Sequence, residues 1–286
     1  MLRLLEAPAA LRDACDEARR AGRRVGLVPT MGYLHDGHLS LLARARQAVG
    51  EAGLVVVSIF VNPTQFGPGE DLERYPRDLD GDVAKCEQSG ADLVFAPPED
   101  AMYAADAETF VDVERISRGL CGDHRPGHFR GVCTVVSKLF NIVGPCAAVF
   151  GAKDYQQLAV IRRMTRDLFL PVEIIGAPIV REVDGLAMSS RNAYLTAEQR
   201  RVAPALHRAL SAARARARIS GEPTSVADVI AEARALLDRE PALAVEYLEV
   251  RDAETLQRVE TATPDRVVML VAAQLGSTRL IDNLLL

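Results

Sequence analysis

The sequence predicts an α/β protein in which an open parallel-sheet domain precedes a second, smaller α+β domain. Through the first part of the chain, short apolar runs alternate with amphipathic stretches, a pattern typical of βαβ units around a parallel sheet. The second part changes to long Ala- and Arg-rich helical stretches and then to two β-like runs. At 286 residues the chain has room for two domains, because single cores usually stop growing near ~250 to 300 residues.

The first part contains five apolar runs with the length of buried strands. The predicted strands are Arg24–Val28, Leu54–Val61, Asp92–Ala96, Ala147–Gly151 and Pro171–Val180. Stretches with helical periodicity alternate with them, at Leu39–Val49, Leu79–Ser89, Gly131–Val143 and Tyr155–Leu168. This alternation predicts a Rossmann-like open sheet, in which ligands bind at the carboxyl ends of the strands.

The second domain is predicted from the change of pattern after the fifth strand. Long helices are expected at Ala197–Arg218 and Ser225–Arg239, followed by β-like runs at Val245–Val250 and Arg266–Ala272. We place the boundary near Ala177–Pro178. The predicted domains are therefore residues 1–177 and 178–286.

Composition and charge restrict the possible partners. The formal net charge is −5, from 39 acidic and 34 basic side chains, so no general attraction to nucleic acid or anionic lipid is expected. No stretch approaches the ~20 apolar residues that cross a bilayer. The five cysteines form no C-x-x-C pair and are odd in number, which is typical of free thiols. We therefore expect a cytoplasmic protein with neither a membrane nor a nucleic-acid partner.

The first passage with clear chemistry is VPTMGYLHDGH at positions 28–38, between a predicted strand and a predicted helix. A helix N-terminus presents unpaired N–H groups and positive dipole charge, which suit a phosphate. Gly32 and Gly37 allow a tight turn, and His35 and His38 can donate to a phosphate on which charge accumulates. A capping histidine or a chance H-x-x-H metal pair is the alternative explanation.

Neither common nucleotide motif is present, because the sequence has no G-x-x-x-x-G-K-[ST] and no G-x-G-x-x-G after a strand. An ATP site would therefore be of another kind. The H-x-G-H pattern favours adenylyl transfer, in which the α-phosphate is attacked and pyrophosphate leaves.

A second passage, GLAMSSRN at positions 185–192, combines small hydroxyl residues with one arginine. Ser189 and Ser190 can bond to phosphate, and Arg191 can hold a phosphate through two N–H groups. A loop of this composition can close over a triphosphate and exclude water. Taken alone, it is more typical of an ordinary hinge turn.

Together the two passages resemble the HIGH and KMSKS motifs of the nucleotidyltransferase superfamily, and their flanks resemble the pantothenate synthetase family. The matching stretches are PTMGYLHDGHLSLL, VSIFVNPTQFGPGEDLERYPRDLDGD, RPGHFRGVCTVVSKLFNIV, VFGAKDYQQLAVIRRMTRDL and IVREVDGLAMSSRNAYL. They occur in the family's order over most of residues 26–195. The second domain matches more loosely, through VEYLEVRD and GSTRLIDN.

The resemblance implies a reaction and a set of site residues. ATP activates (R)-pantoate as pantoyl adenylate, and β-alanine then displaces AMP to give pantothenate. The implied catalytic residues are His38 as proton donor, His35, Lys153, Ser189 and Arg191. The implied ATP contacts are Met31, Gly32, Tyr33, Leu34, His35, Asp36, Gly37, His38, Gly151, Ala152, Lys153, Asp154, Val180, Met188, Ser189, Ser190 and Arg191. Gln65 and Gln157 are the implied ligands of pantoate and β-alanine, and a homodimer is expected.

Mg²⁺ is expected to bridge the ATP phosphates. The acidic run at Asp71, Glu73, Asp78, Asp80 and Asp82 is a candidate source of a carboxylate or of a bound water, and no single ligand can be chosen.

A zinc site and two departures from the family complete the candidate residues. Cys121, His124 and His128 have a spacing that superficially suits zinc, but no fourth ligand is near. Ala152 stands where many relatives carry glutamate, and Cys121 stands where some relatives do. Two rival functions are a nucleotidyltransferase that keeps the nucleotide in its product and a regulatory protein with an inactive site.

Overall fold

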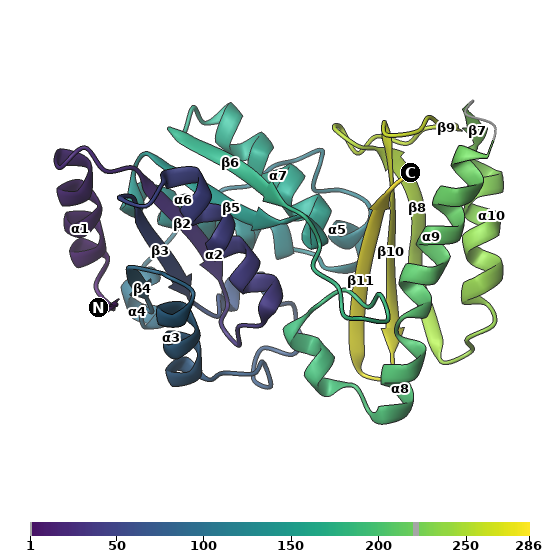
Figure 1. Ribbon diagram of the computed structural model, residues 1–286, viewed down its shortest axis with the longest axis horizontal. Coiled ribbons are helices and arrows are strands. Elements are labelled where there is room, and N and C mark those ends of the chain that lie inside the picture. Colours follow the sequence, from purple (N-terminus) through teal and green to yellow (C-terminus); the bar gives the residue numbers. More distant parts are fainter. Residues whose placement is uncertain (1, 220–222) are drawn as a thin grey trace. The chain divides into compact units, whose positions relative to one another are not determined.

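A computed structural model describes residues 2–219 and 223–286, which form two compact units (Figure 1). Unit 1 comprises residues 2–117, Arg125–Ala152 and Val160–Pro178. Unit 2 comprises Arg118–His124, Lys153–Ala159 and the described part of Ile179–Leu286. The division of the chain into domains 1–177 and 178–286 stays a prediction.

Unit 1 is built on a six-stranded sheet in which every pair of neighbouring strands is parallel, which confirms the predicted α/β class. In spatial order the strands are β1 (Arg3–Leu5), β4 (Leu93–Phe95), β3 (Leu54–Ile59), β2 (Val25–Thr30), β5 (Cys146–Gly151) and β6 (Val172–Ala177). Strand β1 was not predicted, because its three residues are largely exposed and form no apolar run.

Helices flank this sheet (Figure 1). They are α1 (Pro8–Arg20), α2 (Asp36–Val49), α3 (Leu79–Gln88), α4 (Glu99–Met102) and α6 (His128–Val143), while α7 (Tyr155–Asp167) has residues in both units. Leu42 and Ala45 of α2 pack with Val28, Val57 and Val149 of the sheet in one buried cluster. Burial of this apolar face fixes the position of α2, and therefore of its N-terminus, at the end of β2.

The order of the strands reverses at β2. From β2 the chain moves outward to β3 and β4, and it then returns to add β5 on the other side of β2. In open α/β sheets, ligands bind at such a switch point, beyond the carboxyl ends of the strands. The segments that leave β2, β3 and β5 begin at Met31, Phe60 and Ala152. All three lead into stretches that carry predicted site residues.

Unit 2 contains an antiparallel sheet in the order β11 (Thr278–Leu285), β10 (Val267–Leu275) and β8 (Leu243–Asp252). The helices α9 (Ala205–Arg218) and α10 (Val226–Leu237) contribute to the same buried cluster as this sheet. Smaller elements are α5 (Cys121–His124), α8 (Ala197–Val202), β7 (Thr224–Ser225) and β9 (Thr261–Ala262). The predicted α+β composition is confirmed, although β11 was not predicted.

The prediction of one continuous helix over Ala197–Arg218 is wrong. The structure has α8 up to Val202 and a separate α9 from Ala205, with Pro204 at the junction. Proline lacks an N–H group, and its ring clashes with the carbonyl four residues earlier. The apolar periodicity of the sequence continues past Pro204, but the backbone hydrogen bonds of a single helix cannot.

One close contact in unit 1 positions the segment after β3. Gly131 in the first turns of α6 lies against the short 3-10 helix η1 (Pro63–Gln65). A Cβ atom built on Gly131 would lie 2.6 Å from the backbone nitrogen of Gln65 and closer still to the carbonyl of Thr64. Only glycine allows α6 and η1 to approach this closely.

We therefore expect Gly131→Ala to destabilise the fold by about 1 to 3 kcal/mol, the usual cost of inserting a methyl group into a packed site. Urea denaturation would measure the loss. Gly67→Ala is the matched control, because its added Cβ would meet nothing nearer than 3.8 Å. Equal stability of the two variants would show that η1 can move away without cost.

Candidate active site

The segment between β2 and α2 is organised by the two histidines of H-x-G-H. His35 is the N-cap residue of α2, and its Nδ1 accepts a hydrogen bond of 3.1 Å from the backbone N–H of Gly37. Nδ1 of His38 accepts in return from the backbone N–H of His35, at 3.3 Å. The two rings lie 4.1 Å apart. This arrangement is a capping box built from imidazoles, which satisfies two N–H groups that the helix itself leaves unpaired.

The cap also determines the tautomer of both rings. Because each Nδ1 accepts a hydrogen bond, each neutral imidazole carries its proton on Nε2 and can donate from there. Both side chains are partly exposed. The capping explanation is thus correct, and it leaves the second nitrogen of each ring with the chemistry that a phosphate requires.

The residues just before the cap have an unusual backbone. Gly32 and Tyr33 both have positive φ angles, of 82° and 50°. The buried carboxylate of Asp82 in α3 accepts from the N–H groups of Tyr33 and Leu34, each at 2.7 Å. Lys85 donates to the carbonyl of Leu34 at 2.8 Å. These bonds hold the turn, which a non-glycine residue such as Tyr33 adopts only when its surroundings enforce it.

Both carboxylate oxygens of Asp82 therefore accept hydrogen bonds from backbone N–H groups of the turn. Burial raises the pKa of its carboxyl group, while the bonds from Leu34 and Tyr33 and the charge of Lys85 oppose that rise. Asp78, in the same acidic run, caps α3 by accepting from the N–H of Gly81 at 3.1 Å. Within residues 2–219 and 223–286, no three His, Cys, Asp or Glu side chains form a group that could hold a metal.

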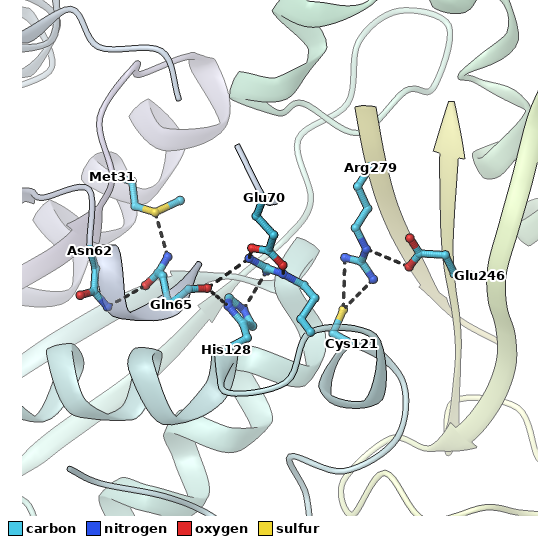
Figure 2. Close-up of polar contacts among 9 residues, drawn as sticks. Met31, Asn62, Gln65, Glu70, Cys121, His128, Glu246 and Arg279 are labelled. Atoms are coloured by element: carbon cyan, nitrogen blue, oxygen red, sulfur yellow. Dashed lines mark hydrogen bonds and ion pairs between the residues drawn. The ribbon is translucent and has the colours of Figure 1, made fainter. Parts of the chain in front are cut away.

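Gln65 lies in η1 after β3 and is almost fully buried, with 9% of its surface exposed. Its Nε2 donates to Sδ of Met31 at 2.8 Å, and its Oε1 accepts from Nδ2 of Asn62 at 3.2 Å. Figure 2 shows Gln65 between these two residues. Gln65 and Met31 are far apart in sequence and are both predicted site residues, and the fold brings them into direct contact.

The backbone of Gln65 is held from the other side, where Glu70 and His128 lie (Figure 2). Nδ1 of His128 lies 2.9 Å from the Gln65 carbonyl oxygen, and Nε2 of His128 lies 3.0 Å from Arg125 Nη1. Since arginine can only donate, Nε2 is the acceptor and Nδ1 donates to the carbonyl. Arg125 also donates twice to Glu70, at 2.8 and 2.6 Å. Burial favours a higher pKa for the Glu70 carboxyl group, but the bonds and charge of Arg125, the backbone bond from Gly67 and the charge of His128 together lower it.

Sequence reasoning did not identify these supporting residues. Asn62, Arg125 and Glu70 all occur in stretches that carried the family resemblance, but nothing in their spacing indicated that they meet around Gln65. Their roles depend on contacts between β3, η1 and α6.

The second predicted nucleotide segment follows β5, where Gly151 ends the strand and Ala152–Asp154 form the 3-10 helix η2. In unit 2, the carbonyl of Lys153 accepts from Nδ2 of Asn283 at 2.8 Å. The side chains of Lys153 and Gln157 are partly exposed. Gln156 is buried instead and accepts from the N–H of Cys121 at 3.0 Å, which distinguishes the two neighbouring glutamines.

The M-S-S-R segment of unit 2 begins on a short hairpin. The N–H of Met188 donates to the carbonyl of Val180 at 3.0 Å, and Arg181 pairs with Asp282 at 2.7 Å. Ser189 then caps the 3-10 helix η3 (Ser190–Tyr194) by accepting from the N–H of Arg191 at 3.3 Å. The predicted loop is therefore a capped turn on an anchored hairpin.

Among the described residues, Cys121 belongs to no group of three His, Cys, Asp or Glu side chains that could hold a metal. Its Sγ contacts the Tyr247 hydroxyl at 3.1 Å and two nitrogens of Arg279 at 3.6 and 3.7 Å. Arg279 also pairs with Glu246 at 2.8 Å (Figure 2). Burial and then the neighbouring Cys121 raise the pKa of Tyr247. The Cys121 thiol thus lies between the Tyr247 hydroxyl and the Arg279 guanidinium.

All five cysteines are free thiols, as predicted. Burial raises the pKa of Cys15 to about 11 and that of Cys86 and Cys133 to about 12, so these thiols are un-ionised near neutral pH. In the described part of the chain, no helix has the length and apolar character that a membrane span needs.

A parallel sheet with its switch point at β2, and with an imidazole-capped helix directly after that strand, defines a Rossmann-like α/β protein, a class in which ligands bind at the carboxyl ends of the strands. The family model described as pantoate-beta-alanine ligase matches residues 3–285, and the chain belongs to that family. It is therefore a ligase that joins pantoate and β-alanine through an amide bond.

Similar proteins agree over the whole length. Pantothenate synthetase of Geobacter sulfurreducens is 52% identical over 285 residues, covering 100% of this chain and 99% of that protein. Pantothenate synthetase of Anaeromyxobacter dehalogenans is 57% identical over 284 residues, covering 98% and 97%.

Two solved structures confirm the fold. The crystal structure of pantothenate synthetase from Thermus thermophilus has a TM-score of 0.92 at 47% identity and covers 99% of this chain and 98% of its own. The pantoate-beta-alanine ligase of Francisella tularensis, complexed with beta-gamma ATP and beta-alanine, has a TM-score of 0.81 at 29% identity, with 100% and 98% covered.

The role of Asp82 can be tested with Asp82→Asn. An asparagine keeps the shape but offers one acceptor oxygen and one NH₂ group, so one of the two N–H groups of the turn loses its partner. We expect a loss of about 1 to 3 kcal/mol in unfolding free energy. Asp80→Asn, at an exposed position of the same helix, is the control and should be neutral within about 0.5 kcal/mol. If the two variants unfold alike, Asp82 does not hold the turn.

Proposed function

We propose that the enzyme condenses (R)-pantoate with β-alanine in two half-reactions driven by ATP. The pantoate carboxylate attacks the α-phosphorus, which gives pantoyl adenylate and pyrophosphate. The β-alanine amine then attacks the acyl carbon, which gives pantothenate and AMP. The observation that carries this proposal is the pair of Nε2–H donors at the N-terminus of α2, at the switch point of a ligase of this family. The relative complexed with beta-gamma ATP and beta-alanine supports it.

Charge stabilisation is the main requirement of the first half-reaction. Negative charge grows on the α-phosphate oxygens as the carboxylate approaches, and preorganised donors stabilise it best where it develops. We assign this task to Nε2–H of His35 and His38, with His38 as the proton donor. Lys153, Ser189 and Arg191 are assigned to the phosphates as well, through the family resemblance.

The remaining ligands are assigned by position. The other predicted nucleotide contacts are Met31, Gly32, Tyr33, Leu34, Asp36, Gly37, Gly151, Ala152, Asp154, Val180, Met188 and Ser190. Gln65 and Gln157 are assigned to pantoate and β-alanine, because an amide can bond to a carboxylate and to a hydroxyl. Each glutamine is close to a predicted nucleotide segment. Gln65 contacts Met31, and Gln157 follows η2 along the chain.

We propose that Mg²⁺ binds together with the nucleotide, because Mg²⁺ usually keeps several waters and is held by substrate phosphates with one or two carboxylates. Bound to the phosphates, it supplies positive charge to their oxygens. We further propose that the enzyme acts in the cytoplasm as a homodimer, which rests on the resemblance and on the free thiols.

The order of the half-reactions is testable by isotope exchange. With pantoate present and β-alanine omitted, labelled pyrophosphate should enter ATP, because adenylation precedes amide formation and is reversible. Omission of pantoate should abolish the exchange. A strict requirement for β-alanine would show that the adenylate does not form first.

The two nitrogens of His38 can be separated by substitution. Asparagine places an acceptor near the position of Nδ1 and nothing at Nε2, whereas alanine removes both. We expect His38→Asn to keep the cap and the melting temperature, and His38→Ala to lose about 0.5 to 2 kcal/mol. Both should slow single-turnover adenylation by roughly 10²- to 10³-fold.

Lys153→Ala should slow adenylation to a similar extent with little loss of stability, since its side chain is partly exposed.

For His38, an Asn variant with normal adenylation would remove Nε2 from the mechanism and leave only the cap.

A further inference from the structure

The stretch GSTRLIDN at positions 276–283 leads into β11, where its last two residues are buried and polar. Asp282 and Asn283 have 4% and 5% of their surfaces exposed. Buried polar side chains need hydrogen-bond partners, and each of these two has a partner in or beside a predicted nucleotide segment of unit 2.

The two side chains reach opposite faces of the antiparallel sheet, because consecutive residues of a strand point to opposite sides. Leu280, two positions before Asp282, belongs to the buried cluster that includes α9. Arg279, four positions before Asn283, contacts Cys121 of α5. Asp282 therefore lies on the α9 face of the sheet, and Asn283 lies on the α5 face.

On the α5 face, Asn283 holds the 3-10 helix η2. Its Nδ2 donates to the backbone carbonyl oxygen of Lys153 at 2.8 Å. A carbonyl oxygen can only accept, so the nitrogen of the amide and not its oxygen lies against Lys153. The bond fixes the backbone from which the Lys153 side chain, assigned to the phosphates, extends.

On the α9 face, Asp282 holds the hairpin that leads into M-S-S-R. Its two carboxylate oxygens accept from Nη1 and Nη2 of Arg181, at 2.7 and 2.9 Å. Nη1 of Arg181 also donates to the carbonyl of Gly185 in the same hairpin, at 3.0 Å. A bidentate pair of arginine and carboxylate fixes direction as well as distance. Because the N–H of Met188 bonds to the carbonyl of Val180, beside Arg181, the start of M-S-S-R is fixed with the hairpin.

We infer that Asp282 and Asn283 are positioning residues, which hold the two phosphate-assigned segments of unit 2 at fixed places on β11. Since the two residues are consecutive, a shift of either segment along the strand breaks one of these sets of bonds. Adenylation benefits from this arrangement, because developing charge is stabilised best by donors that are already in place. This role rests on the proposed function, in which Lys153 and Arg191 contact phosphate.

The test measures pantoate-dependent exchange of pyrophosphate into ATP for Asn283→Ala, Lys153→Ala and the double variant. Asn283→Ala keeps the Lys153 side chain but releases its carbonyl. We expect kcat of exchange to fall roughly 10- to 100-fold, as for a displacement of about 1 Å, with pantoate KM within about threefold of wild type. The double variant should match Lys153→Ala within about twofold, because Asn283 acts through Lys153.

Gln274→Ala is the matched control. Gln274 lies in β10, which pairs with β11, and its Nε2 donates to Glu246 of β8 at 3.1 Å. The control thus also removes one amide hydrogen bond of the same sheet, but one that reaches neither segment. Its kcat should stay within about twofold of wild type, as for a substitution away from the site.

The single and double variants show which proposal fails if exchange behaves otherwise. Normal exchange by Lys153→Ala would remove Lys153 from the proposed function, and with it the kinetic role of Asn283. A strong effect of Lys153→Ala beside a normal kcat of Asn283→Ala would overturn the positioning role alone. Effects that multiply in the double variant would do the same, because a residue that only stabilises the sheet acts independently of Lys153.

The hairpin provides a second test, which also covers the case in which Asn283→Ala does not fold. Asp282→Asn keeps the shape, but its NH₂ group cannot accept, so Arg181 loses one of its two bonds. We expect kcat of exchange to fall roughly 10-fold in the wild-type background, and to change less than about twofold in the Arg191→Ala background. Equal losses in the two backgrounds would show that Asp282 stabilises the fold without positioning the M-S-S-R segment.

Discussion

The unpaired N–H groups at the start of α2 are the constraint on which the rest of the site depends. A helix cannot satisfy these groups itself, and here two imidazoles form the cap, while the buried carboxylate of Asp82 holds the turn just before it. Each histidine uses Nδ1 as an acceptor in the cap, so the proton of the neutral ring is on Nε2. The same hydrogen bonds that end the helix cleanly therefore set the chemical state of the residues assigned to catalysis.

Packing extends this constraint to the segment after β3. The absence of a side chain at Gly131 lets α6 approach η1, and the Gly131 carbonyl then orients Asn62. His128 and Arg125, at the start of the same helix, hold the carbonyl of Gln65. The backbone and the side chain of one glutamine are thus both fixed from α6.

Capping and site chemistry also coincide in unit 2. Ser189, assigned to the phosphates, is the N-cap of η3, and the carbonyl of Lys153 holds Asn283. Helix termini recur in these roles because they gather N–H groups and positive dipole charge where the chain turns. Stability and anion binding then draw on the same local geometry, which is why a capping role does not argue against a catalytic one.

The sequence by itself determined the α/β class, most of the strands and helices, the H-x-G-H segment and the family, because these follow from local periodicity and from contiguous motifs. It did not reveal β1, β11 or the break at Pro204, where the local pattern was too weak or misleading. Tertiary structure alone decided that Asp82 serves the turn at Tyr33 and that Asn62 orients Gln65. These roles arise from contacts between residues distant in sequence, and the direction of an amide depends on which neighbours can donate and which can only accept.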